Sequence, residues 1–181
     1  MWYGGVITEA ATGLPVSLDE VKSRLYVDFG DDDELIYGLI SEVADRIERR
    51  CLIRLMPQTI IVKCDYFSDF ARVPEGPLSD SAVQAITYVD AEGSNQTLAA
   101  SVYELRPNGI DAAIILKFSQ AWPPIQSGSR ISVELVAGYE TIPPEIKTAI
   151  QIGVAELYEN RQDRASADWS LFDQLLVNFK R

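Results

Sequence analysis

Residues 35–64 read LIYGLISEVADRIERRCLIRLMPQTIIVKC, and along them the spacing of the apolar side chains changes from a helical to a strand-like period. In the first half the apolar residues share one face of a helix: Leu35, Ile36, Leu39, Ile40, Val43 and Ile47. Charged side chains take most other positions, so the pattern predicts an amphipathic helix over 32–51. Pro57 ends this pattern, and the β-branched residues after it favour a strand over 58–64.

A shorter helix is expected before this one. Ser17 and Glu20 have the spacing of a capping box, in which each side chain satisfies a backbone N–H at the start of a helix. Apolar residues follow at helical spacing and predict a helix over about 17–26. An acidic run then separates the two helices, and Asp31 or Asp32 can cap the second one.

Short strand-like runs continue after residue 58, separated by turns that contain Gly, Pro or Asn. The clearest run is 130–136, because Ile131, Val133 and Leu135 fall on one face and polar residues on the other. We therefore expect five or six short strands over 57–138, arranged as an antiparallel sheet or a small β sandwich.

The C-terminal part of the sequence is helical again. Pro143 and Pro144 suit a first helical turn, and a stripe of apolar residues follows through about residue 160. The stretch 160–168 is polar, which indicates a tether. Five large apolar side chains then recur at helical spacing: Trp169, Phe172, Leu175, Leu176 and Phe179. This stripe either packs on the chain's own core or anchors an arm on a partner, for which aromatic residues are typical.

The order of these segments predicts an α+β fold with a mainly helical core, formed by the N-terminal helix pair and the C-terminal helices, and an inserted antiparallel sheet or small sandwich. The expected boundaries are an N-terminal arm at 1–16, a helical core at 17–56 and 139–162, an inserted β domain at 57–138, and a C-terminal helical arm at 163–181.

Composition narrows the range of functions. The 181-residue chain has no histidine, which excludes His-dependent nucleophilic catalysis and His metal ligands, and it has no glycine-rich phosphate loop, so no cofactor is expected. A net charge of −11 disfavours a protein that grips the DNA backbone. We expect no membrane span and no secretory signal. Cys51 and Cys64 are expected as two buried thiols in a reducing compartment, with a disulfide between them as the less favoured alternative.

Two charged clusters have alternative interpretations. The acids at 28–34 could hold a divalent cation in a carboxylate-dependent metal enzyme such as a nuclease, but their contiguous position favours a solvated helix start. The arginines near residue 50 suit a helix C-terminus, and they could also pair with the acids of a neighbouring copy. The candidate inter-subunit residues are Asp31, Asp32, Asp33, Arg46, Arg49 and Arg50.

Several segments, in their order along the chain, resemble one known family. The most informative are Pro15-Val16-Ser17-Leu18-Asp19-Glu20-Val21-Lys22, Leu35-Ile36-Tyr37-Gly38-Leu39-Ile40, Val133-Glu134-Leu135-Val136-Ala137-Gly138-Tyr139 and Ile142-Pro143-Pro144-Glu145. They are similar to the head–tail connector (adaptor, or head-completion) proteins of long-tailed phages, prophages and gene transfer agents.

The resemblance implies a structural virion protein without catalytic residues. Such adaptors are made in the bacterial cytoplasm and form a homo-oligomeric ring, often a dodecamer, at the head–tail junction of the particle. The ring joins the portal to the next connector or tail component and surrounds passing DNA without sequence-specific binding. In this family the C-terminal segment commonly inserts toward the portal, which makes the aromatic stripe a candidate portal-binding site. The alternative is another head- or tail-completion component.

Overall fold

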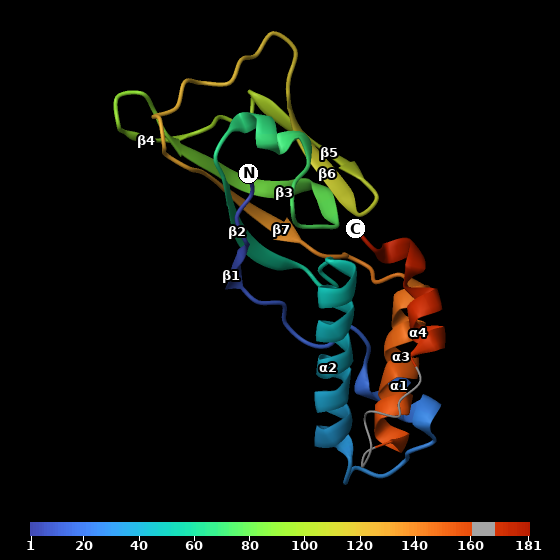
Figure 1. Cartoon of the computed structure of the whole chain (residues 1–181). Helices are drawn as coiled ribbons and strands as arrows, with labels where there is room; N and C mark the ends of the chain where they lie inside the picture. Colours follow the sequence, from blue (N-terminus) through green and yellow to red (C-terminus); the bar gives the residue numbers. More distant parts are fainter. Residues whose placement is uncertain (161–168) are drawn as a thin grey trace. The chain divides into compact units, whose positions relative to one another are not determined.

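The computed structural model describes residues 1–160 and 169–181 (Figure 1). The chain divides into two compact units. The first, here called the sheet unit, consists of Met1–Ala11 and Met56–Tyr139. The second, called the helical unit, consists of Thr12–Leu55 and Glu140–Arg181.

The sheet unit is built from antiparallel strands and one 3-10 helix. Its elements are β1 (Val6–Glu9), β2 (Gln58–Cys64), η1 (Phe67–Ala71), β3 (Leu78–Val89), β4 (Asn95–Thr97), β5 (Tyr103–Asn108), β6 (Asp111–Leu116) and β7 (Ile131–Ala137). Five strands form one sheet in the order β1-β2-β7-β3-β4, and β5 and β6 form a separate hairpin. The paired strands of both sheets run antiparallel, as expected for short strands joined by tight turns.

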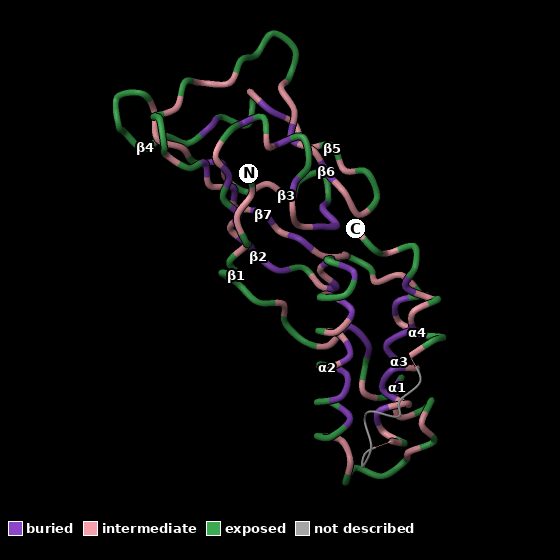
Figure 2. The backbone as a smooth tube through the Cα atoms, in the orientation of Figure 1, coloured by how far each residue is buried: buried purple, intermediate pink, exposed green. Residues whose placement is uncertain are grey.

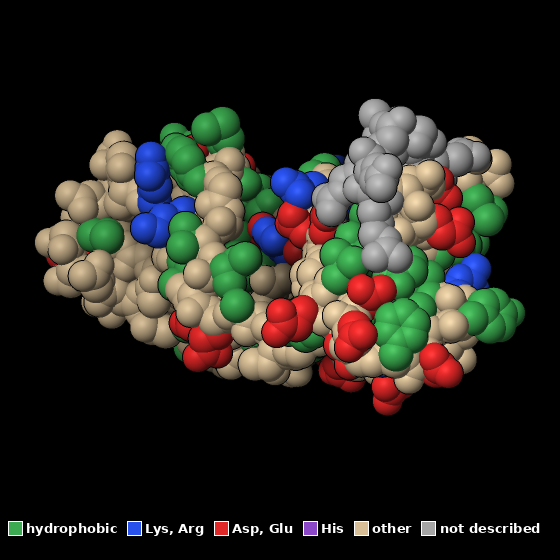
Figure 3. All heavy atoms as spheres, turned by 90° about the horizontal axis from the view of Figure 1, so that it is seen from below, with side chains coloured by type: hydrophobic (Ala, Val, Ile, Leu, Met, Phe, Trp, Pro, Cys, Tyr) green, Lys and Arg blue, Asp and Glu red, His purple; other side chains and the backbone are tan. Residues whose placement is uncertain are grey.

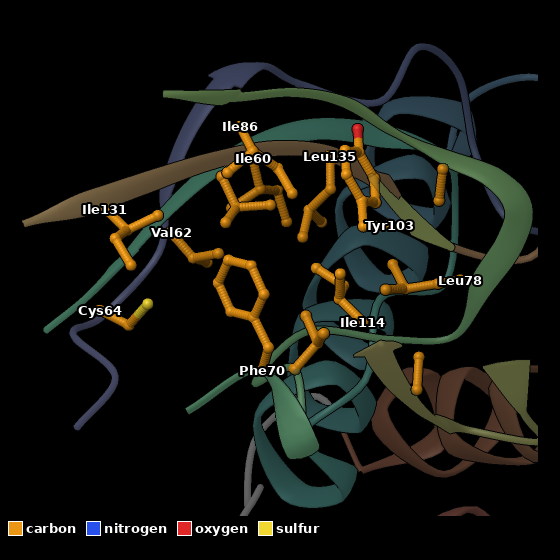
Figure 4. Packing of buried hydrophobic residues seen from close by; sticks show 14 of the residues in the cluster. Ile60, Val62, Cys64, Phe70, Leu78, Ile86, Tyr103, Ile114, Ile131 and Leu135 are labelled. Atoms are coloured by element: carbon orange, nitrogen blue, oxygen red, sulfur yellow. The ribbon is translucent and has the colours of Figure 1, made fainter. Parts of the chain in front are cut away.

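The core of the sheet unit lies between the five-stranded sheet and the segments that cover it. β2 and β7 bury alternate residues, which confirms the predicted inward face with Ile131, Val133 and Leu135. Figure 4 shows Phe70 of η1 and Ile114 of β6 pointing toward these strand residues. The hairpin and η1 thus form a second layer over one face of the sheet.

The helical unit contains α1 (Leu18–Leu25), α2 (Asp33–Cys51), α3 (Pro144–Glu159), α4 (Ser170–Leu175) and the 3-10 turn η3 (Val177–Phe179). The capping box at the start of α1 is confirmed, because the Ser17 hydroxyl accepts the Glu20 backbone N–H and the Ser17 backbone N–H donates to the Glu20 carboxylate. Pro144 occupies the first turn of α3, as predicted.

Except for Leu35, which is exposed, the predicted apolar stripes of α2 and α3 are buried along one side of each helix, shown in purple in Figure 2. Gly153 of α3 lies at the point where α2, α3 and α4 meet. A Cβ atom at this position would come within 2.9 Å of Val43, 3.2 Å of Trp169 and 3.3 Å of Phe172. The absence of a side chain at Gly153 therefore lets these helices approach closely.

The structure confirms the α+β class but corrects two expectations. The description as mainly helical overstated the helices, because 33% of the described residues are helix and 28% are strand. Residues 1–11 belong to the sheet unit and are not a separate arm, because β1 pairs with β2 through Val6 and Ile61. All four β1 side chains are exposed, so no buried pattern marked this strand in the sequence.

The C-terminal segment also differs from the expected continuous helix. α4 ends at Leu175, and the chain continues as η3 before it ends beside α2, where the Arg181 N–H donates to the Cys51 carbonyl at 3.1 Å. The predicted tether lies at 161–168, outside the described residues. Folding of the helical unit without the inserted β segment 57–138 remains a prediction.

Candidate subunit and partner interfaces

The acidic residues at the start of α2 have partners within the helical unit. The Lys22 ammonium lies 2.6 Å from the Asp33 carboxylate, and the Tyr158 hydroxyl donates to Asp32. Asp32 is the N-cap residue of α2, but its side chain makes no capping hydrogen bond. Among residues 1–160 and 169–181, no group of three or more His, Cys, Asp or Glu side chains is placed to hold a metal ion. Asp32 and Asp33 thus link the start of α2 to α3 and α1.

The arginines at the end of α2 form one wall of a cleft of about 360 Å³. The Arg46 guanidinium lies 4.1 Å from the centre of the Trp169 ring, which is a cation–π contact. Arg50 pairs with Asp173 of α4, and Arg49 pairs with Asp45 one turn earlier on α2. The cleft is lined by Arg46, Arg49, Arg50, Trp169, Phe172 and Asp173.

The Arg46–Trp169 and Arg50–Asp173 contacts hold α4 against the C-terminal end of α2. Sequence reasoning assigned the arginines to a solvated helix end or to a neighbouring copy, and it did not foresee their contacts with α4. Pairing with a neighbouring copy remains a prediction.

The aromatic stripe of the C-terminal segment packs on the helical unit in this structure. Phe172 and Leu176 are buried, and the Trp169 ring meets the Phe172 ring edge-to-face with centroids 4.9 Å apart. Trp169, Leu175 and Phe179 are half-buried. Partner binding by all five residues stays a prediction, and it requires α4 to separate from α2 and α3.

Sequence reasoning missed a set of exposed apolar residues at the two ends of α2. Tyr26 and Phe29 lie between α1 and α2, and Leu52 follows the last residue of α2. The sequence carried one signal for Tyr26 and Leu52. Helices commonly end with Gly or Asn in the left-handed conformation, whereas α1 ends with Tyr26 and α2 ends with Leu52 in that conformation.

The two cysteines are free and buried. Burial raises the pKa of the Cys64 thiol to about 12 and also raises the pKa of Cys51. Each thiol is therefore protonated near neutral pH. No helix in the described part of the chain combines the length and apolar character needed to cross a membrane.

Comparison with known proteins gives a family and a set of solved structures. The family model described as phage gp6-like head-tail connector protein matches residues 15–106. No curated protein matches the chain.

Three solved structures share the fold over nearly the whole chain. A chain from the virion of a native gene transfer agent (GTA) particle is 20% identical, with a TM-score of 0.76 and coverage of 97% of this chain and 94% of that chain. A chain from the neck of an empty GTA particle with C6 symmetry is 19% identical, with a TM-score of 0.74 and coverage of 96% and 95%. A chain from the neck of a native GTA particle with C12 symmetry is 20% identical, with a TM-score of 0.67 and coverage of 94% of both.

Proposed function

The chain belongs to the family of phage gp6-like head–tail connector proteins, and we propose that it is a subunit of an adaptor ring that joins the portal of a phage-like head to the tail. Family membership confirms the resemblance inferred from the sequence and the structural role that the resemblance implied. The match over residues 15–106 is the observation that carries the proposal, because it covers the whole of α1 and α2 and the strands β2, β3 and β4, and it ends within β5.

A homo-oligomeric ring is supported by the neck structures that share this fold, which have C6 and C12 symmetry. A ring needs a heterologous contact, in which one surface of a subunit meets a different surface of the next subunit. We propose a dodecamer in the particle, with DNA passing through its centre. The net charge of −11 is consistent with a wall that lets DNA slide, because acidic side chains repel the phosphate backbone.

The C-terminal stripe is the proposed contact with the portal. Docking of the whole stripe has an internal cost, because Phe172 and Leu176 would leave the helical unit and the Arg50–Asp173 ion pair would break. Exposing each of the two apolar side chains costs about 2–3 kcal/mol. The portal groove must bury at least as much apolar surface, or α4 stays on its own unit and only the half-buried stripe residues Trp169, Leu175 and Phe179 meet the portal.

Attachment to heads tests this proposal. Tail-less heads of the particle would be incubated with the purified chain and imaged by electron microscopy. We expect a ring of density below the portal, and we expect tails to join heads only when the ring is present. A matched variant that ends at Asn160 lacks the stripe and should fail to attach. If the full chain binds neither heads nor tails, the adaptor function is wrong.

A further inference from the structure

Two helix ends in the helical unit have a backbone conformation that does not suit their residues. Tyr26 follows α1 and Leu52 follows α2, and both have φ of 56° in the left-handed region. Glycine or asparagine is common at such positions, whereas the left-handed conformation costs other residues about 1–2 kcal/mol of conformational free energy. Burial does not offset this strain within the chain, because Tyr26 is 96% exposed and Leu52 is 63% exposed.

Tyr26 belongs to a surface that combines aromatic and acidic side chains. We call it the acidic aromatic patch, and it consists of the exposed residues Tyr26, Asp28, Phe29, Asp31, Glu34 and Tyr37. They lie in the α1–α2 connection and the first turns of α2. Figure 3, a view from below, shows acidic and hydrophobic side chains interspersed at this end of the helical unit.

Leu52 belongs to an arginine-rich surface at the other end of α2, where Arg49 and Arg50 are ion-paired with Asp45 and Asp173. We call it the basic aliphatic patch, and it consists of Arg49, Arg50, Leu52, Leu171 and Val177. The Arg50–Asp173 ion pair and the hydrogen bond from Arg181 to Cys51 hold α4 and η3 beside the end of α2. Leu52, Leu171 and Val177 each expose at least half of their surface there.

We propose that the acidic aromatic patch of one copy binds the basic aliphatic patch of the next copy, and that this head-to-tail contact closes the ring. This inference rests on the proposed adaptor ring. The Arg49 and Arg50 side chains are 73% and 47% exposed despite their ion pairs, so each can accept a second carboxylate from the next copy, and both patches offer apolar surface to bury. A twofold contact could pair the same two patches reciprocally, so the charges alone do not fix the direction; a ring is what requires the head-to-tail arrangement.

The length of α2 prevents the two patches from meeting within one chain. Its 19 residues separate them by about 28 Å at a rise of 1.5 Å per residue. The neighbouring copy is therefore the partner of matching chemistry. In this arrangement the strained helix ends place Tyr26 and Leu52 in the contact, where burial offsets the strain that the isolated chain carries.

Replacing Tyr26 or Leu52 by glycine distinguishes a role in the contact between copies from a role in the stability of the single chain. Tyr26→Gly and Leu52→Gly relieve the left-handed strain, so the melting temperature of the unassembled chain should stay the same or rise. Ring formation on tail-less heads should weaken at least tenfold for each variant. The control is Phe118→Ala, which removes a 97% exposed aromatic side chain from the sheet unit and should leave ring formation unchanged.

Thiol cross-linking on assembled particles tests the direction of the contact. The double variant Tyr26→Cys/Leu52→Cys, treated with a short bismaleimide, should give a ladder of covalent oligomers beyond the dimer. Each single variant should stay monomeric on a denaturing gel, and the native thiols should not react because both are buried. A double variant whose cross-linking stops at the dimer, or dimers from Tyr26→Cys alone, would reveal a twofold contact and overturn the inference.

The outcomes separate this inference from the adaptor function. If both glycine variants form rings as the unmodified chain does, or if the double cysteine variant gives no ladder on rings that have formed, the patches are not the contact and the adaptor function still stands. If the unmodified chain forms no ring on heads, both proposals fail.

Discussion

Replacing Phe172 by alanine measures how firmly α4 is held in the free protein. Phe172 is 1% exposed, and it packs near Gly153 of α3 and edge-to-face on Trp169. A buried phenylalanine removes about 150–250 Å² from water, which at about 25 cal/mol per Å² sets an upper bound of about 4–6 kcal/mol. Measured Phe→Ala losses in cores are about 3–5 kcal/mol. We therefore expect the Phe172→Ala variant to lose about 4 kcal/mol of unfolding free energy.

Urea unfolding followed by far-UV circular dichroism gives this free energy, and an unchanged m-value would show that the unfolding reaction is the same. The matched control is Leu171→Ala on the same helix. Leu171 is 51% exposed, so its loss should change the free energy of unfolding by no more than about 0.5 kcal/mol.

If both variants stay within about 0.5 kcal/mol of the unmodified chain, α4 does not rest on α2 and α3 in solution. The packing described for Phe172 and Leu176 would then belong to a minor state, and the stripe would be a free anchor. A loss of about 4 kcal/mol for Phe172→Ala instead means that the portal must compete with the helical unit for α4.

Three further outcomes are expected. Ser17→Ala should cost about 1 kcal/mol at neutral pH, measured by urea unfolding. Hydrogen bonds from the Ser17 backbone N–H and hydroxyl lower the pKa of Glu20 below its ordinary value of 4.5. The part of the stabilisation that depends on the Glu20 carboxylate is therefore present above that pH and is lost as the pH falls through the folded-state pKa, so a cost of Ser17→Ala that grew on acidification would contradict the capping-box assignment. Cys51 and Cys64 should not react with iodoacetamide in the folded chain at neutral pH, because their thiols are buried and protonated, and both should react in urea; rapid labelling detected by mass spectrometry without urea would contradict the described packing. Replacing 60–136 by a Gly-Ser linker should leave a helical spectrum with cooperative melting, and global unfolding would show that the two units depend on one another.

The sequence by itself determined the elements whose signals are local. The 3.6-residue stripes of α2 and α3, the alternation in β7 and the capping box at Ser17 each depend on residues within a few positions of one another. A helix or strand that buries one face must repeat its apolar residues with its own period, so these elements can be predicted from the sequence alone. The change from acidic to basic side chains along α2 is local in the same sense, and this charge pattern alone suggests a contact between copies.

Only the tertiary structure decided which distant residues meet. β1 joins the sheet through backbone hydrogen bonds, which leave no side-chain pattern in an exposed edge strand. Arg50 and Asp173, which form an ion pair, are 123 residues apart in the sequence. The need for glycine at position 153 is evident only from the structure, because a Cβ there would come too close to Val43 of α2. The aromatic stripe was compatible with a core or with an anchor because its apolar spacing is the same in both, and the packing of Phe172 on α3 is a property of the fold and not of that spacing.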